Sequence, residues 1–548
     1  MVIVVFASYK SIKFKSSNKE NLYNYYTKYN LYFCKVNKYK VSYKDTELFS
    51  KLVMDYLDEN KKLKPFISDF PSMENFERKI NSKKNYKTNR SLLVDVLKKQ
   101  NSSISLSVKS KENIDLLISD NTFTITTGHQ LCLFTGPLYF IYKIISTINL
   151  TEKLKNEYPE IDFVPVFWMA AEDHDFDEVN HIHLFGKKIV WDSHQEGSVG
   201  RMNTLGIQSV LDELKQTIGD SENGKQLLDI FEKAYLNNSN LADSTRFLIN
   251  ELFGKYGLVI IDGDDKSLKK EFSPFIKKDI LEKANFKSLQ YCSDQLSVDY
   301  KLQAFVREIN FFKISKGKRV RIDGEVSEQE VDNNPEYFSP NVLIRPLYQE
   351  FLLPNLAYIG GGAEVSYWMQ LKEVFSENKV DFPLLILRNS VMIMEEKEKS
   401  KWSDLGFEIQ DIFAEEHSLH SRFVQSKSSI SFKKEINDLD LLFQSILHKT
   451  TDKSLFSSIN SEKIKQNKSL QKLEKKLLKS EKQKHENSIS QITKIKKKLF
   501  PNSSLQERFN NFIPFYLNYG EKFIETLKEE LNPLDTNFLI LSLQKNKK

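Results

Sequence analysis

Three separated stretches of this sequence, residues 126–143, 168–181 and 343–368, combine side chains able to bind small molecules and to transfer protons. The second is the richest, because five carboxylates and two histidines lie between Glu172 and His181, directly after an apolar run. Ligands of open α/β sheets bind beyond the carboxyl ends of the strands, so this position favours a site over a solvated turn. The acidic stretch could bind an amine and accept its proton.

The acidic stretch also allows a geometry suited to proton transfer or to a metal ion. If it is helical, four side chains share one face: His174, Asp177, Glu178 and His181. Mixed carboxylate and histidine ligands suit zinc, but the sequence has neither HExxH nor a nearby supporting cysteine. Proton transfer or amine binding is therefore the preferred interpretation, and the metal requirement stays open.

The first stretch joins a predicted strand to a predicted helix through Thr127-Gly128-His129-Gln130 and Gly136-Pro137. In such a turn, backbone N–H groups and the positive end of the helix can meet an anion. Tyr139 and Lys143 lie on the helix, with Lys143 two turns in. An ordinary turn with a lone histidine is an equal alternative, because neither GxGxxG nor GxxxxGK[ST] is present.

The third stretch places a cation and three glycines before a predicted helix. Consecutive glycines at 360–362 let the backbone approach a ligand, and the guanidinium of Arg345 suits a carboxylate or a phosphate. Arg345 and Glu364 are therefore candidate substrate contacts. The alternative is a tight turn, with Arg345 held in a structural ion pair.

Two further motifs are better explained by structure than by chemistry. Residues 313–317, Lys-Ile-Ser-Lys-Gly, resemble the lysine signature of class I aminoacyl-tRNA synthetases, but the alternating pattern around them predicts a β-hairpin. Cys132 lies between two leucines and has no activating base beside it in the sequence, which indicates buried packing.

The composition is that of a folded protein, since 40% of the 548 residues are hydrophobic and 12% are aromatic. A formal net charge of +6 does not by itself imply a nucleic-acid or membrane partner. No run approaches the roughly 20 apolar residues that span a bilayer. Cys34, Cys132 and Cys292 lack the spacing of a disulfide framework or a zinc cluster. We expect a soluble, cytoplasmic protein.

The order of elements predicts an α/β fold with a Rossmann-like parallel sheet, because strand-like runs such as 122–126, 163–169, 258–262 and 383–387 alternate with helical stretches. We divide the chain into a poorly ordered extension (1–37), a core with inserted subdomains at about 183–250 and 285–340 (38–400), a connector (401–429), a coiled-coil hairpin (430–500) and a helical tail packing back on the body (501–548).

The predicted hairpin rests on heptad spacing from Phe432 to Ile446, a break at 450–453, and a second helix over about 455–499 without glycine or proline. Residues 461–500 contain thirteen lysines and four glutamates. Such a face could bind a polyanion, but no arginine or aromatic residue is interleaved among the lysines. A solvated coiled coil is the preferred interpretation, and nucleic acid is not the expected partner.

Taken together, these stretches resemble the bacillithiol biosynthesis cysteine-adding enzymes, BshC. The resemblance rests on residues 126–131, 134–139 and Lys143, on 167–178, and on 345–350, 353–354 and 360–368. It extends more weakly from about Tyr39 into the tail. The chain departs from the pattern at His129, where many relatives have glutamine, and at Cys132, a position associated with a small residue.

This resemblance implies a Rossmann-type core, a coiled coil that pairs two subunits into a homodimer, and a ligase that forms a carbon–nitrogen amide bond. The implied reaction joins the carboxylate of L-cysteine to the amine of glucosaminyl malate, the last step of bacillithiol biosynthesis. Because amide formation needs an activated acyl group, we hypothesise that ATP is used, although no ATP motif is readable.

In this hypothesis Asp173, His174 and Asp175 are catalytic, because the attacking amine must be bound and deprotonated. The predicted substrate-binding residues are Thr127, Gly128, His129, Gln130, Tyr139, Lys143, Glu172, Asp177, Arg345, Gln349, Glu350, Gly361, Glu364 and Trp368.

Two other functions stay open at this point. A tRNA-linked or nucleotidyl-transferring enzyme of class I synthetase-like fold would use the lysine-rich hairpin as its polyanion arm. A non-catalytic coiled-coil scaffold would need none of the site residues. The ligase hypothesis requires that Gly128, His174 and Arg345 converge at the carboxyl edge of one sheet.

Overall fold

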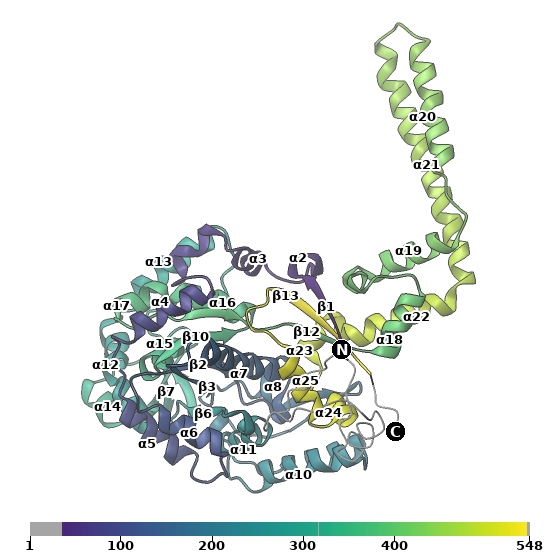
Figure 1. Ribbon diagram of the computed structural model, residues 1–548. Coiled ribbons are helices and arrows are strands. Elements are labelled where there is room, and N and C mark those ends of the chain that lie inside the picture. Colours follow the sequence, from purple (N-terminus) through teal and green to yellow (C-terminus); the bar gives the residue numbers. More distant parts are fainter. Residues whose placement is uncertain (1–35, 316, 545–548) are drawn as a thin grey trace, which may run out of the picture.

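The computed structural model describes residues 36–315 and 317–544, and its centre is a parallel five-stranded sheet (Figure 1). The strands lie in the order β11 (Leu384–Leu387), β10 (Asn355–Gly360), β2 (Thr122–His129), β3 (Asp162–Met169) and β6 (Val259–Asp262). The predicted Rossmann-like sheet is confirmed. The strand order reverses between β2 and β10, and a switch point of this kind leaves a crevice at the carboxyl ends of the two strands.

Strands β3 and β6 are apolar along their length because helices cover both faces of the sheet. Phe167 and Met169 pack in the core around α7 (Tyr139–Glu157), while Val166 and Trp168 pack on the opposite face. The helices of that opposite face include α3 (Lys51–Leu57), α5 (Arg90–Gln100), α6 (Val108–Leu116), α12 (Lys266–Glu282), α15 (Arg345–Leu352), α16 (Gly362–Trp368) and α17 (Lys372–Glu377). The carboxyl ends of the strands are thus held between two packed layers.

Two insertions interrupt this core. The first follows β3 and contains α8 (Phe176–Val179), the hairpin β4 (His181–Leu184) and β5 (Lys187–Val190), and helices α9 (Ile207–Ile218), α10 (Glu222–Leu236) and α11 (Leu241–Phe253). The second contains α13 (Phe286–Ser297), β7 (Phe311–Ser315), β8 (Lys318–Arg321), α14 (Glu328–Asn333) and β9 (Phe338–Pro340). Strands β7 and β8 form the hairpin predicted at 313–317.

A second sheet joins the two ends of the described chain. Strand β13 (Asn537–Leu543) lies between β1 (Val36–Ser42) and β12 (Val391–Glu395). The predicted helical tail contains α23 (Gln506–Phe509), α24 (Ile513–Tyr519) and α25 (Lys522–Glu530), but it also includes the buried strand β13, which the prediction lacked. Of the predicted extension 1–37, residues 1–35 lie outside the described residues, and residues 36 and 37 belong to β1.

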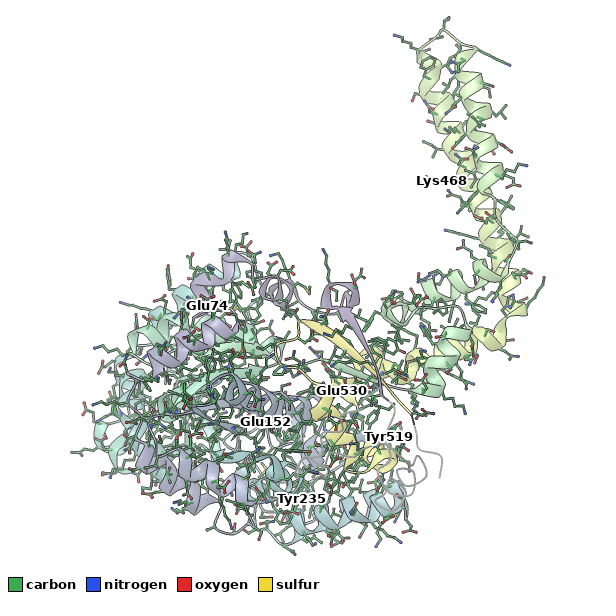
Figure 2. All side chains as sticks on the ribbon, viewed as in Figure 1. Glu74, Glu152, Tyr235, Lys468, Tyr519 and Glu530 are labelled. Carbon is green, nitrogen blue, oxygen red and sulfur yellow. The ribbon has the colours of Figure 1, made fainter. Side chains whose placement is uncertain are left out.

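A helical arm projects from the body (Figure 1). It is built from α19 (Glu416–Lys427), α20 (Lys433–His448), α21 (Ser454–Lys484) and α22 (Glu486–Leu499). The predicted second helix is interrupted at His485, whose backbone is not helical. No residue of α20 or α21 is buried, and Figure 2 shows side chains around Lys468 projecting from the arm. Among the described residues, no helix has the length and apolarity needed to cross a membrane.

The acidic stretch 172–181 is not the continuous helix considered above. Only α8, a four-residue helix, forms within it, and His181 begins β4. Another segment binds the start of this stretch instead: the Val199 N–H donates to the Asp173 carbonyl at 2.7 Å, and the Gly200 N–H donates at 2.8 Å to the carbonyl of Ala171, the residue before the stretch. The proposed shared helix face is therefore absent.

Candidate active site

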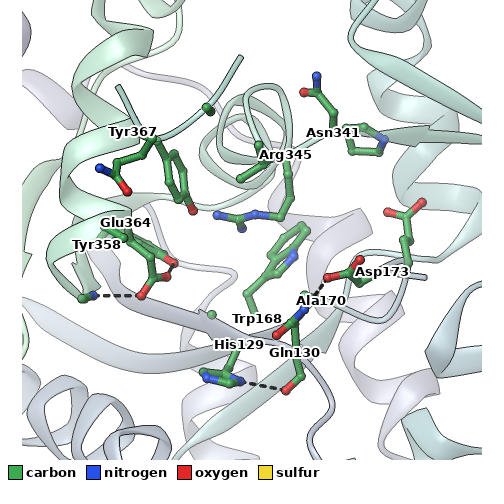
Figure 3. A pocket seen from close by; sticks show the side chains of 18 of the residues that line it. His129, Gln130, Trp168, Ala170, Asp173, Asn341, Arg345, Tyr358, Glu364 and Tyr367 are labelled. Atoms are coloured by element: carbon green, nitrogen blue, oxygen red, sulfur yellow. Dashed lines mark hydrogen bonds between the residues drawn. The ribbon is translucent and has the colours of Figure 1, made fainter. Parts of the chain in front are cut away.

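A cavity of about 810 Å³ lies at the switch point of the parallel sheet. The carboxyl ends of β2 and β3 form its floor, the turn from β10 to α16 forms one wall, and α15 with the β7–β8 hairpin forms another (Figure 3). Gly128, Asp173 and Arg345 line it, so the three predicted stretches converge at one edge of the sheet, but His174, which the ligase hypothesis placed with Gly128 and Arg345, is not on the wall. The volume is in the range of small-molecule sites.

An ion pair between the buried Lys143 and the partly buried Glu364 joins two walls of the cavity. The Lys143 Nζ lies 2.9 and 2.8 Å from the two carboxylate oxygens of Glu364, and it also donates to the carbonyl of Gly128. Glu364 accepts two more hydrogen bonds, from the Gly361 N–H at 2.8 Å and from the Tyr358 hydroxyl at 2.7 Å. The pair locks α7 to α16 across the cavity floor.

The environment of this pair explains its ionisation. Burial disfavours the charged form of Glu364, but Lys143 and the Gly361 N–H outweigh it and lower the pKa to about 2. Burial lowers the pKa of Lys143, an effect that Glu364 opposes. Since the Gly361 N–H is already bound by Glu364, the start of α16 is occupied by the chain's own carboxylate. An anionic ligand must therefore be held by other groups.

Arg345 is the best-placed of these groups. It begins α15, and its guanidinium points toward the Tyr367 hydroxyl (Figure 3). Its Nη1 donates to the side chain of Gln349 at 2.9 Å, and its Cζ lies 5.8 Å from the centroid of the Tyr358 ring. No acidic partner within salt-bridge distance is found among the described residues, so the guanidinium can pair with a carboxylate or phosphate of a ligand.

His129 and Gln130 close the other end of the floor. The His129 ring packs on Tyr139 and Phe140, and its Nδ1 lies 3.0 Å from the Gln130 carbonyl. Burial, with a further effect of Lys143, lowers the pKa of His129 to about 4, so the ring is neutral at pH 7. The Gln130 amide donates to Asp173 at 2.7 Å, which fixes that carboxylate at the cavity edge.

The acidic turn contributes two carboxylates of different character. Glu172 pairs with the buried Lys269, and burial raises its pKa. Asp173 is less enclosed, and it accepts from Gln130 and from the His174 N–H at 2.8 Å. Since Glu172 already has a cationic partner, Asp173 is the carboxylate available to an incoming ammonium group.

His174 lies beside the cavity rather than on its wall, with 47% of its side chain exposed. Its Nδ1 is 3.1 Å from Nη1 of Arg319. A guanidinium only donates, so Nδ1 is the acceptor in this contact. Of these two neighbours, the structure therefore places Asp173, and not His174, on the cavity wall.

Ten of the seventeen predicted site residues line the cavity wall: Gly128, His129, Gln130, Tyr139, Lys143, Glu172, Asp173, Arg345, Gly361 and Glu364. Seven others lie off it: Thr127, His174, Asp175, Asp177, Gln349, Glu350 and Trp368.

The displaced candidates have identifiable structural surroundings. Thr127 donates to the Ile359 carbonyl at 2.8 Å within the sheet. Trp368 is fully buried and stacks on Tyr358 at 4.4 Å. Glu350 is buried beneath the wall, where it accepts from Gln349 at 2.8 Å, and burial raises its pKa to about 7. These residues support the wall, whereas Asp175 and Asp177 face solvent.

Four arginines of the cavity were missed: Arg307, Arg319, Arg388 and Arg508. Arg388 directly follows strand β11. Glu172 was predicted because it comes soon after a buried strand, and the same criterion would have identified Arg388. The others carry no local signal. With Lys143 and Arg345 they make six basic residues against three acidic ones, Glu172, Asp173 and Glu364. The cavity is therefore suited to an anionic ligand.

A parallel sheet with a cationic cavity at its switch point, joined to a helical arm, defines a Rossmann-like protein with a coiled-coil extension. Comparison with protein families agrees. "Bacillithiol biosynthesis BshC, N-terminal Rossmann-like domain" matches residues 35–389, and "Bacillithiol biosynthesis BshC, C-terminal coiled-coil domain" matches residues 391–543. The chain belongs to the BshC family.

Similar proteins carry the name "Putative cysteine ligase BshC". That of Flavobacterium johnsoniae is 44% identical over 525 residues, covering 92% of this chain and 99% of its own. That of Flavobacterium psychrophilum is 45% identical over 525 residues, covering 91% and 98%. That of Christiangramia forsetii is 45% identical over 529 residues, covering 92% and 98%. These names favour the ligase among the three functional alternatives.

Proposed function

We propose that this protein is a ligase that joins the carboxylate of L-cysteine to the amine of glucosaminyl malate, forming the amide bond of bacillithiol. The family and the names of the relatives support the cysteine ligase class. The observation that carries the proposal is the charge arrangement of the cavity. Cations such as Arg345 line a pocket that also presents the carboxylate of Asp173.

This arrangement suits the two reacting groups. Arg345 would bind the cysteine carboxylate, because its guanidinium has no acidic partner among the described residues. Asp173 would bind the ammonium group of the sugar and accept its proton, since only the neutral amine has a lone pair for attack. The hydrogen bond from Gln130 holds that carboxylate in place. The Lys143–Glu364 ion pair holds helix α7 against helix α16 and so fixes the relative position of the two cavity walls.

ATP is the proposed source of activation, since it would convert the carboxylate into an acyl phosphate or acyl adenylate. The cavity residues fit a polyanion, because basic side chains outnumber acidic ones on its wall. Arg307 and Arg319 would hold the phosphates, as neither forms an ion pair with a residue that the structure describes. We do not propose that the start of α16 binds the phosphates, because the Gly361 N–H already donates to Glu364.

The test is a reconstituted reaction with purified protein, L-cysteine, glucosaminyl malate and ATP, analysed by mass spectrometry. We expect bacillithiol to form with an equal amount of ADP or AMP, and the identity of that nucleotide reports the activation chemistry. Deletion of the gene should cause glucosaminyl malate to accumulate. Lack of product under all nucleotide conditions, together with normal bacillithiol in the deletion strain, would overturn the proposal.

We also propose that the arm pairs two copies of the chain. Exposed apolar side chains along α20 and α21 support this, and they are Leu441, Leu442, Leu455, Phe456, Ile464, Leu473 and Leu477. A solvated helical hairpin gains nothing from such residues, whereas a second copy would bury them.

A further inference from the structure

One side chain of the cavity comes from far beyond the Rossmann-like core. Arg508 lies on the short helix α23, after the arm, whereas every other residue of the cavity wall lies between 128 and 388. The C-terminal part of the chain therefore completes a cavity that the parallel sheet begins.

Buried hydrogen bonds fix α23 against the free edge of β12. The Gln506 amide both donates to the Ile393 carbonyl at 2.9 Å and accepts from the Ile393 N–H at 2.8 Å. The Glu507 carboxylate accepts from the Val391 N–H at 3.0 Å. Gln506 and Glu507 are 2% and 1% exposed. The backbone that carries Arg508 is thus set by pairing with a strand.

Glu507 also pairs with a second arginine of the cavity. Its Oε1 accepts from Nη2 of Arg388 at 2.8 Å, and Arg388 Nη1 donates to the Asn389 carbonyl at 2.9 Å. The Nε of Arg388 is buried and has no hydrogen-bond partner among the described residues. A buried donor without a partner carries a desolvation cost that a ligand oxygen would remove.

Arg508 lacks a partner as well. Its side chain forms no hydrogen bond or ion pair with any residue in the described part of the chain. Arg388 and Arg508 both act on Tyr139: burial raises the pKa of that phenol, and the two cations oppose the rise. The Arg388 Cζ lies 5.1 Å from the centroid of the Tyr139 ring, and Tyr139, Arg388 and Arg508 line the same cavity.

We propose that Arg508 and Arg388 form a subsite for a carboxylate of the amine substrate, and that Glu507 is a positioning residue that holds Arg388. The identity of the amine substrate rests on the proposed function, since the malyl group of glucosaminyl malate bears carboxylates and its sugar bears the reacting amine. A planar guanidinium pairs with a carboxylate through two parallel hydrogen bonds, and paired arginines give such a subsite specificity.

The first test measures binding and needs no turnover. L-malate is titrated calorimetrically into the unaltered chain, Arg508→Met and Arg321→Met. Arg321 is an exposed arginine of β8 outside the cavity wall, so it controls for loss of one positive charge. We expect Arg508→Met to weaken L-malate binding about tenfold to a hundredfold, and Arg321→Met to change it less than about twofold. No binding to the unaltered chain, or equal losses in both variants, would overturn the subsite.

The second test separates the substrates kinetically. Arg508→Met should raise KM for glucosaminyl malate about tenfold or more and leave KM for L-cysteine unchanged. With methyl glucosaminide, which has no carboxylate, the variant and the unaltered chain should react equally. A loss that persists with methyl glucosaminide would refute the subsite. If the unaltered chain makes no product, the proposed function fails while the L-malate result still decides the subsite.

Glu507→Gln tests the positioning role. We expect the variant to raise the KM for glucosaminyl malate and to leave the KM for L-cysteine unchanged, whereas a general structural defect would alter both KM values. If this buried substitution prevents folding, Glu507→Asp, which keeps the charge but shortens the side chain, tests the positioning role instead. Arg508→Lys on the exposed side chain tests the subsite itself. Lysine retains the charge without the planar fork, so L-malate binding should be intermediate, and full retention would argue against paired hydrogen bonding.

Discussion

The Lys143–Glu364 pair provides the most quantitative test of how this cavity is built. Glu364 has a pKa of about 2 in place of the ordinary 4.5, which corresponds to about 3 kcal/mol of favourable interaction with its ionised form. Because the folded-state pKa is lowered, this stabilisation is present above about pH 4.5 and is lost as the pH falls toward 2. Glu364→Gln should therefore lower the free energy of unfolding by about 3 kcal/mol at pH 7, and by roughly half as much near pH 3.

The assay is urea unfolding followed by tryptophan emission, with the unfolding free energy extrapolated to water. Trp168 and Trp368 are buried near the cavity and report on this part of the core. The matched control is Glu521→Gln, which removes one partner of the exposed Lys255–Glu521 pair, 3.1 Å apart. An exposed pair contributes little, so this variant should lose less than about 1 kcal/mol.

A double-mutant cycle completes the test. Lys143→Met and Glu364→Gln each leave a partner without its counter-charge, but the double variant leaves none. The loss in the double variant should therefore be smaller than the two single losses together, by about 1 to 3 kcal/mol. Strictly additive losses, or a Glu364→Gln penalty no larger than that of Glu521→Gln, would refute the assignment of a stabilising ion pair.

Three further predictions follow from the same geometry. Asp173→Asn should lower kcat for bacillithiol formation by about 10² to 10⁴ without changing the thermal midpoint, whereas Asp220→Asn on the surface should change neither. His129→Gln should reduce the loss of stability on acidification, because burial lowers the His129 pKa from 6.5 to about 4. The stability that the neutral histidine contributes is complete above pH 6.5, and about 2 kcal/mol of it is lost by pH 5. Denaturation curves should show this loss in the unaltered chain but not in the variant. Leu473→Ser with Leu477→Ser, two exposed positions on α21, should shift sedimentation equilibrium from dimer to monomer, and an unchanged dimer would reject pairing through the arm.

Local patterns in the sequence were sufficient to predict the main segments that line the cavity. The turn from β2 into α7, the acidic residues after β3 and the glycines before α16 were each found from contiguous residues. Strand, turn and helix preferences act over a few residues, so they can be read without knowing the fold. The same logic failed at 172–181, where the Val199 N–H donates to the Asp173 carbonyl in place of a helical hydrogen bond.

Tertiary structure alone decided which of these residues meet. Lys143 and Glu364 are 221 residues apart, and they pair because β10 lies beside β2. Arg508 reaches the cavity because α23 pairs with the edge of β12. Gln349 and Glu350 share the helix of Arg345 but lie beneath the wall, since successive helix positions point in different directions.

The sequence by itself thus determined the elements, the Rossmann-like class and the family resemblance, all of which depend on local periodicity and short motifs. Strand order, the charge balance of the cavity and the contribution of the C-terminal segment emerged only in the folded chain. The physical reason is that long-range pairing is chosen by the packing of the whole core. No local stretch carries the information about which distant partner will neutralise its charge.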